Sequence, residues 1–237
     1  MLVINLKIDD YLSSKAHIRY KQILNELDKP IKFFICPQNE IQAYGLCGNY
    51  QDEGVYKVFV AEEIKKQDDI DHNFLHECLH LKQIKKGIPE ILPRKDDINK
   101  EVWTSFGIEL SSAFLDVPVE KTLKKWGFTN EKIRQERLNN LIAKLEKYEK
   151  TYNCNHHFFE CIISIQCALN IVTYDKKQII NINQLIKKYD NIISKTKEIV
   201  KIMESTDFTN SASIASGMVK VINFLALSTK IKVVSYK

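Results

Sequence analysis

The sequence has no apolar run long enough to cross a membrane. A transmembrane helix needs about 20 consecutive apolar residues, and no stretch of the 237-residue chain approaches that length. The opening residues, MLVINLKIDD, have no basic segment and no small-residue cleavage site, so we expect no signal peptide. These absences argue against a membrane protein and predict a cytoplasmic location.

The six cysteines lack the paired spacing of a zinc ribbon. They stand at positions 36, 47, 78, 154, 161 and 167. Without an export signal, reduced thiols in a cytosol are the simple interpretation. The chain also has no internal repeat and no low-complexity tract. With 44% hydrophobic and 27% charged residues, it has the composition of a soluble globular protein of one or two domains.

The net charge of +5 is unevenly distributed along the chain. Residues 130–237 contain 17 Lys and Arg against 10 Asp and Glu, which leaves 18 basic and 20 acidic residues before them. A basic excess suits an acidic partner or nucleic acid, but solvated lysine-rich helix faces explain it more simply. A nucleic-acid-binding regulator therefore ranks behind the hypotheses that follow.

The most informative stretch is His76-Glu77-Cys78-Leu79-His80, a complete H-E-x-x-H. On a helix, histidines four residues apart project from one face and can bind a single Zn²⁺. Glu77 follows the first of them and can act as general base on a water at the metal. Three local features predict the required helix: acidic residues that begin at Asp68, an apolar face, and Gly87 and Pro89, which would end it.

About three strands are predicted before this helix. Residues 31–36 and 41–47 are β-rich runs, and residues 55–61, with the sequence VYKVFVA, form the clearest strand in the chain. The stretch 48–54 between the last two runs resembles a turn.

A zinc site of this type needs a third ligand, usually a carboxylate from the next helix, with one position left for water. A helix is predicted over residues 98–115, with Pro118 interrupting it. Its polar stripe consists of Ser105, Glu109, Ser112 and Asp116. Glu109 is the first choice as ligand. Asp116 is the alternative, either as a ligand or as an acceptor that orients a zinc histidine, and Glu101 and Glu120 are further candidates.

The chain from residue 130 is predicted to be helical. Residues 131–151 and 157–172 are expected to form helices, the second buried. Residues 184–203 carry apolar pairs every seven residues, a pattern typical of a bundle helix or a partner-binding helix. A further helix is expected over residues 215–227, and residues 231–236 could form a strand.

These features resemble zincins and, more narrowly, the ImmA/IrrE group of small bacterial metallopeptidases. A strand, VYKVFVAEEI, precedes a short loop and HNFLHECLHL, and IELSSAFLDVP is similar to the second zinc helix of the family. VPVEKTLKKWGF is similar to a motif of phage- and mobile-element-associated peptidase-like proteins. The resemblance covers residues 30–128, and the family's Glu-Ala-Asn is replaced here by Glu109-Leu110-Ser111.

The resemblance implies an α+β zincin-like core that binds zinc through His76, His80 and Glu109, with Glu77 as the catalytic base. It also implies cleavage of a regulatory or partner protein in the cytosol. The strand Tyr56–Ala61 would lie at the sheet edge, where Tyr56, Val58 and Val60 would bind an extended substrate by β-addition.

We therefore predict a zincin-like metallopeptidase domain over residues 1–128 and an all-α domain over residues 129–237. The second domain would regulate the enzyme or select its substrate, and its helices could bind a partner protein. The alternative is a zincin-like zinc-binding regulatory protein with weak or no hydrolysis.

Overall fold

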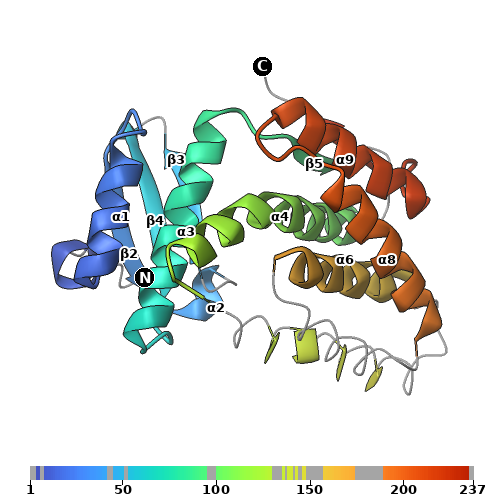
Figure 1. The fold of residues 1–237 in the computed structure, drawn as a ribbon, viewed down its shortest axis with the longest axis horizontal. Helices are drawn as coiled ribbons and strands as arrows, with labels where there is room; N and C mark the ends of the chain where they lie inside the picture. Colours follow the sequence, from blue (N-terminus) through green and yellow to red (C-terminus); the bar gives the residue numbers. More distant parts are fainter. Residues whose placement is uncertain are drawn as a thin grey trace. The chain divides into compact units, whose positions relative to one another are not determined.

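The computed structural model describes most of the chain. The described residues are 4–5, 8–41, 45–50, 53–94, 100–129, 135–136, 138–140, 142–143, 146–147, 157–173 and 189–234. They form a mixed α+β protein, rich in helix, with two small sheets (Figure 1). None of the described helices is both long enough and apolar enough to span a bilayer.

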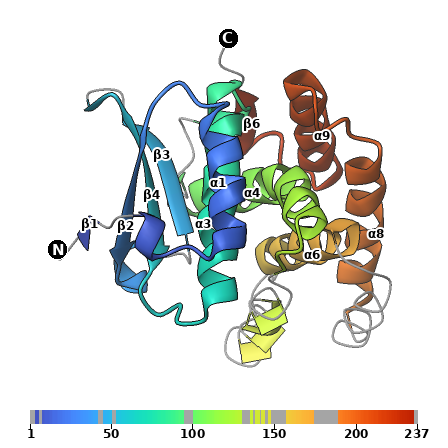
Figure 2. The same ribbon diagram turned by 60° about the vertical axis from the view of Figure 1, so that its left-hand side comes forward.

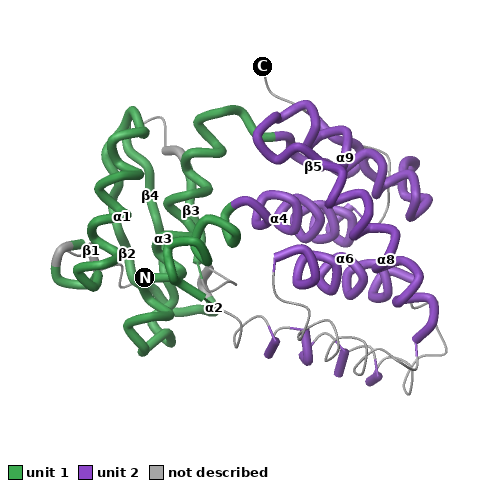
Figure 3. The backbone as a smooth tube through the Cα atoms, viewed as in Figure 1, with its two compact units in different colours: residues 1–88, 119–130 green, residues 89–118, 131–237 purple. Residues whose placement is uncertain are grey.

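The chain divides into two compact units (Figure 3). Unit 1 comprises Met1–Ile88 and Val119–Asn130, and unit 2 comprises Pro89–Pro118 and Glu131–Lys237. The division falls inside a single long helix, and it assigns residues 89–118 to unit 2, although the sequence predicted them to belong to the first domain.

Unit 1 contains a four-stranded sheet in the order β1-β2-β4-β3. Its strands are β1 (Ile4–Asn5), β2 (Ile31–Cys36), β3 (Gly45–Tyr50) and β4 (Val55–Ala61). β4 pairs in parallel with β2 and antiparallel with β3, so it is an interior strand. The prediction of an edge strand at Tyr56–Ala61 is therefore wrong. The nearly continuous apolar run of β4 is typical of a strand that is buried on both faces.

β3 forms the end of this sheet and begins later than the sequence predicted. Gln38–Ile41 forms a short helix, α2, instead of the start of the strand, and residues 48–50 extend β3 instead of forming a turn. Among the described residues β3 pairs only with β4, so it lies at one edge of the sheet.

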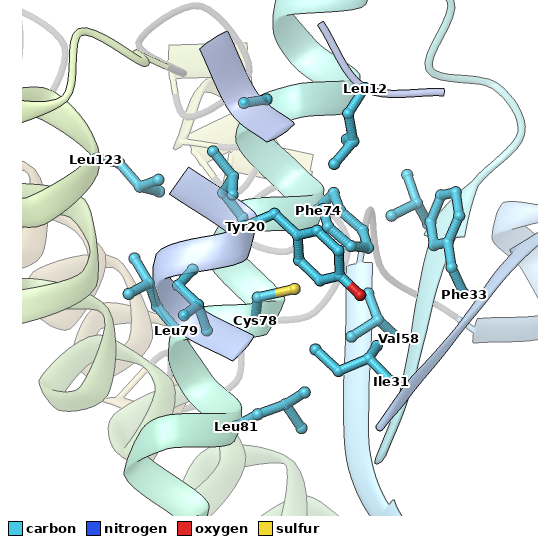
Figure 4. Packing of buried hydrophobic residues seen from close by; sticks show 14 of the residues in the cluster. Leu12, Tyr20, Ile31, Phe33, Val58, Phe74, Cys78, Leu79, Leu81 and Leu123 are labelled. Carbon is cyan, nitrogen blue, oxygen red and sulfur yellow. The ribbon is translucent and has the colours of Figure 1, made fainter. Parts of the chain in front are cut away.

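Two helices, α1 (Ser14–Leu24) and α3 (Gln67–Lys85), cover one face of the sheet (Figure 2). The predicted helix around the H-E-x-x-H motif is confirmed. Aromatic rings fill the space between helices and sheet: the Phe74 ring centroid lies 4.9 Å from that of Phe33 and 5.4 Å from that of Tyr20 (Figure 4). Phe74, Leu75, Cys78 and Leu81 are fully buried, which turns His76 and His80 to the other side of α3.

Unit 2 consists of helices and a two-stranded sheet. Outside the long helix, the described residues of unit 2 include β5 (Glu90–Pro93), α6 (His157–Thr173), α8 (Asp190–Glu204), α9 (Ser211–Phe224) and β6 (Ile231–Val234). β6 confirms the strand predicted near residues 231–236. It pairs antiparallel with β5, so the C-terminal region is not all-α. In α8, Ile192 of the predicted seven-residue pattern packs into a cluster with Ile163 and Cys167 of α6. This part of the apolar face of α8 is therefore covered by α6.

The long helix α4 (Lys100–Lys125) continues through Pro118, which the sequence predicted to interrupt it. A proline inside a helix costs about 3 kcal/mol through the lost hydrogen bond and the ring clash. Buried apolar side chains on both sides of it offset this cost, among them Phe114, Val117, Val119 and Leu123. One unbroken helix therefore carries all the candidate carboxylates from Glu101 to Glu120.

The phenol of Tyr56 makes unit 1 sensitive to alkaline pH. It is buried and donates a 2.8 Å hydrogen bond to Asp28 Oδ1. Burial, this hydrogen bond and the Asp28 charge raise the pKa of Tyr56 from 10.0 to about 12. Above pH 10 the unfolded chain loses this proton first, so stability should fall by up to about 1.4 kcal/mol per pH unit until about pH 12.

Urea unfolding of the wild type and Tyr56→Phe between pH 9 and pH 11.5 tests this. The variant should be less stable at pH 9, because it lacks the hydrogen bond, and its stability should decline less steeply above pH 10. Parallel curves for the two proteins would contradict the assignment.

Candidate metal centre

His76 and His80 point the same ring nitrogen towards a common point. Their Nε2 atoms lie 2.9 Å apart on one face of α3. In a tetrahedral zinc site with bonds of about 2.0–2.1 Å, two nitrogen ligands are roughly 3.3 Å apart. A shift of a few tenths of an ångström therefore turns the observed pair into two ligands of one ion.

The other ring nitrogen of each histidine faces an acceptor. His76 Nδ1 lies 2.9 Å from Glu120 Oε1, and His80 Nδ1 lies 2.7 Å from Gln83 Oε1. An ionised carboxylate and an amide oxygen can only accept, so these two contacts favour the tautomers with the proton on Nδ1. Both Nε2 atoms are then left with the lone pair that a metal requires, an arrangement typical of metal-binding histidines.

A buried carboxylate completes this group. Asp116 lies one turn before Glu120 on α4, so the helix itself brings both acids to the same face. The ligand atoms of His76, His80 and Asp116 all lie within 4.8 Å of one another, and Asp116 is 8% exposed. A second group, within the same limit, consists of His72, His76 and Glu120. The described residues therefore include buried His, Asp and Glu groups that could bind a metal ion.

Glu109, which the sequence favoured as third ligand, belongs to neither group. It precedes Glu120 by 11 residues on α4, which corresponds to roughly 16 Å along the axis. Its Oε2 accepts a 2.7 Å hydrogen bond from Gln166 Nε2 of α6. Since Glu120 contacts His76, the helix does not bring Glu109 together with the histidines. Glu101 lies still further from Glu120, in the first turn of α4.

The Glu77 side chain extends towards β3. A Cβ atom added at Gly45 would come within 2.7 Å of Glu77 Oε1 and 2.9 Å of its Cγ, so a glycine is required for Glu77 to lie there. The nearby thiol of Cys47 has a pKa well above its usual value because of burial, the Glu77 charge and a hydrogen bond to Glu77. The Glu77 carboxylate thus lies beside the edge strand of the sheet.

The residues predicted to bind substrate lie elsewhere. Tyr56, Val58 and Val60 are each at most 1% exposed and belong to the interior strand β4. Their backbone is already paired on both sides, so this strand is not available for β-addition.

Four residues of the site were missed or ranked low from the sequence: Gly45, His72, Gln83 and Glu120. His72 had a visible signal, because it stands one helical turn before His76 and extends the motif to H-x-x-x-H-E-x-x-H. Gly45 had a weaker one, since a glycine in a strand often marks a close approach.

Comparison with protein-family models, curated proteins and solved structures gave no match. The resemblance to ImmA/IrrE peptidases therefore stays a prediction from the sequence motifs.

Proposed function

We propose that this protein is a zinc-dependent metallopeptidase in which His76, His80 and Asp116 bind the ion. The observation that carries the proposal is the convergence of two Nε2 atoms, 2.9 Å apart, in rings whose Nδ1 atoms face Glu120 and Gln83. Two imidazoles and a carboxylate are a typical protein contribution to a catalytic zinc, with the fourth position left for water. Sheet, motif helix and second helix would then form a zincin-like core.

The chain's own groups have distinct roles in this reaction. Zn²⁺ supplies a Lewis acid that polarises a carbonyl and makes a water molecule more acidic. Glu77 would accept one proton from the water molecule as the water oxygen bonds to the carbonyl carbon, and would donate that proton to the amide nitrogen as the C–N bond breaks. Glu120 and Gln83 hold the imidazole rings of His76 and His80 in the ligating tautomer.

β3 is the strand that suits an extended polypeptide substrate. Among the described residues it pairs on one side only, and Glu77 lies next to it at Gly45 and Cys47. A substrate added as the next strand would form backbone hydrogen bonds along β3. We therefore propose that the substrate, a regulatory or partner protein, binds along β3 and not along the strand that contains Tyr56, Val58 and Val60.

Metal content and cleavage together test this proposal. The wild-type protein, equilibrated with zinc and then desalted, should retain one zinc per chain, and it should cleave members of a peptide library in a reaction that a chelator stops. Absence of retained zinc would contradict the whole proposal. One zinc without cleavage of any peptide or protein would instead indicate the alternative, a zinc-binding regulatory protein.

Gly45→Ala should separate the position of the base from the binding of the metal. The added methyl group overlaps Glu77 Oε1 and Cγ, so the carboxylate must move, while no ligand is touched. A displacement of about 1 Å can cost about 100-fold in rate, so we expect hydrolysis slower by about 10- to 100-fold with zinc retained.

Leu46→Ala is the matched control, because Leu46 is the next residue of β3 and its side chain is 44% exposed. Cleavage rates and zinc content of both variants are measured side by side. An unchanged rate in Gly45→Ala would show that Glu77 does not need this position.

A further inference from the structure

His72 lies one turn before His76 on α3 and reaches the same carboxylate. Its Nε2 atom is 3.3 Å from Glu120 Oε2, while His76 Nδ1 is 2.9 Å from Glu120 Oε1. His72 is 1% exposed and Glu120 is 3% exposed. One buried carboxylate therefore lies between two imidazoles, with one oxygen for each.

We infer that His72 is a positioning residue for the metal centre and acts on His76 through Glu120. The inference rests on the proposed function, in which His76 Nε2 binds the ion. An ionised carboxylate has no proton to donate, so His72 must donate from Nε2 and His76 from Nδ1. With both oxygens occupied, the Glu120 carboxylate cannot rotate without breaking a buried hydrogen bond, and the His76 ring is held with Nε2 facing the ion.

Without His72, Glu120 Oε2 would lose this donor inside the protein. Loss of this buried hydrogen bond removes one restraint on the carboxylate, which can then turn towards other groups, including the metal. The His76 ring would then lose its fixed acceptor. The effect of His72 is therefore exerted on the geometry and affinity of the centre, although His72 does not bind the catalytic ion.

His72, His76 and Glu120 also come close enough to be considered as a second metal site. Two ions would require His76 to bind through both ring nitrogens and to lose its Nδ1 proton. The separations of 3.3 Å and 2.9 Å from the two Glu120 oxygens are those of hydrogen bonds, which need no such loss. These distances therefore favour a hydrogen-bonded chain over a second metal site at His72, His76 and Glu120.

The first experiment determines the histidine tautomers in the wild-type protein. Long-range ¹H–¹⁵N correlation spectra, with and without zinc, should show His72 protonated at Nε2 in both states and His76 protonated at Nδ1. His17, which contacts Tyr20 on α1, is a reference outside the centre. A His72 ring protonated only at Nδ1 could not donate to Glu120 and would overturn the inference.

The second experiment compares His72→Leu, which lacks the donor, with His72→Gln, whose side-chain amide restores one. Loss of an outer hydrogen-bonding partner typically lowers metal affinity by about 10- to 100-fold, and we expect this in His72→Leu, with recovery in His72→Gln. The visible absorption of the Co²⁺-substituted proteins should shift in the Leu variant only. His17→Leu is the matched control.

If His72→Leu has the zinc affinity and the Co²⁺ absorption of the wild type, His72 has only a packing role and the inference is overturned. Two zinc ions per wild-type chain would also overturn it. If His72→Leu does not fold, the tautomer measurement decides alone. Failure of the proposed function can be told apart from failure of this inference. If the wild-type protein binds no zinc, the proposed function fails, but the His72 tautomer can still be measured.

Discussion

Glu77→Gln is expected to slow peptide hydrolysis by about 100- to 10,000-fold, the usual contribution of a general base, and to leave bound zinc unchanged. Glutamine keeps the shape of the side chain but has no basic oxygen to accept the proton. It also keeps the contacts at Gly45, so the fold around β3 should persist. Zinc content and cleavage rate are measured on the same preparation, with Glu62→Gln, an exposed position, as control.

The thiol of Cys47 supplies an independent check on this variant. Burial is the largest cause of its raised pKa, and the Glu77 charge and hydrogen bond add to it. Removing the charge should lower the pKa in part and speed alkylation of Cys47 in the folded protein. A Glu77→Gln protein that holds zinc and cleaves at the wild-type rate would place the base elsewhere.

Asp116→Ala is expected to abolish stoichiometric zinc, whereas Glu109→Gln should leave it unchanged. The Asp116 carboxylate lies close to the imidazoles of His76 and His80. Glu109 lies two turns before Asp116 on the same helix and contacts Gln166 instead. Glu120→Gln should give an intermediate loss of about 10- to 100-fold in affinity, because it weakens the acceptor that orients His76.

Competition with a chromogenic chelator measures the three affinities, and thermal unfolding of the metal-free proteins controls for folding. The opposite order, with zinc lost in Glu109→Gln and kept in Asp116→Ala, would restore the assignment that the sequence favoured. Equal losses in Asp116→Ala and Glu120→Gln would make both acids ligands.

The sequence was most reliable where a short local pattern carries the information. The H-E-x-x-H helix was predicted because the spacing of His76 and His80, the acidic start and the apolar face all lie within one segment, and α3 confirms it. The strand Val55–Ala61 was predicted for the same reason, from a compact run of β-forming residues. In both cases neighbouring residues decide the conformation.

The sequence was wrong where a distant element decides the outcome. Pro118 is a helix breaker by its local chemistry, yet apolar burial on both sides of it keeps α4 continuous. The apolar run of residues 55–61 already suited an interior strand, but the family resemblance implied an edge strand, and only the pairing with β2 and β3 decided between them. A short strand such as β5 was missed because its partner, β6, lies far away in the sequence.

For the candidate metal centre, the sequence by itself predicted the two histidines and the acid between them, because a single helix fixes their spacing. The choice among Glu109, Asp116 and Glu120 depended on where α4 meets α3, and the carboxylates on that one helix differ too little in local pattern to be ranked. Only the tertiary structure could decide that His72 and Glu120 form a buried chain to His76, and that Glu77 needs a glycine at position 45. Contacts between segments 30 to 50 residues apart depend on packing, which periodicity along the chain does not specify.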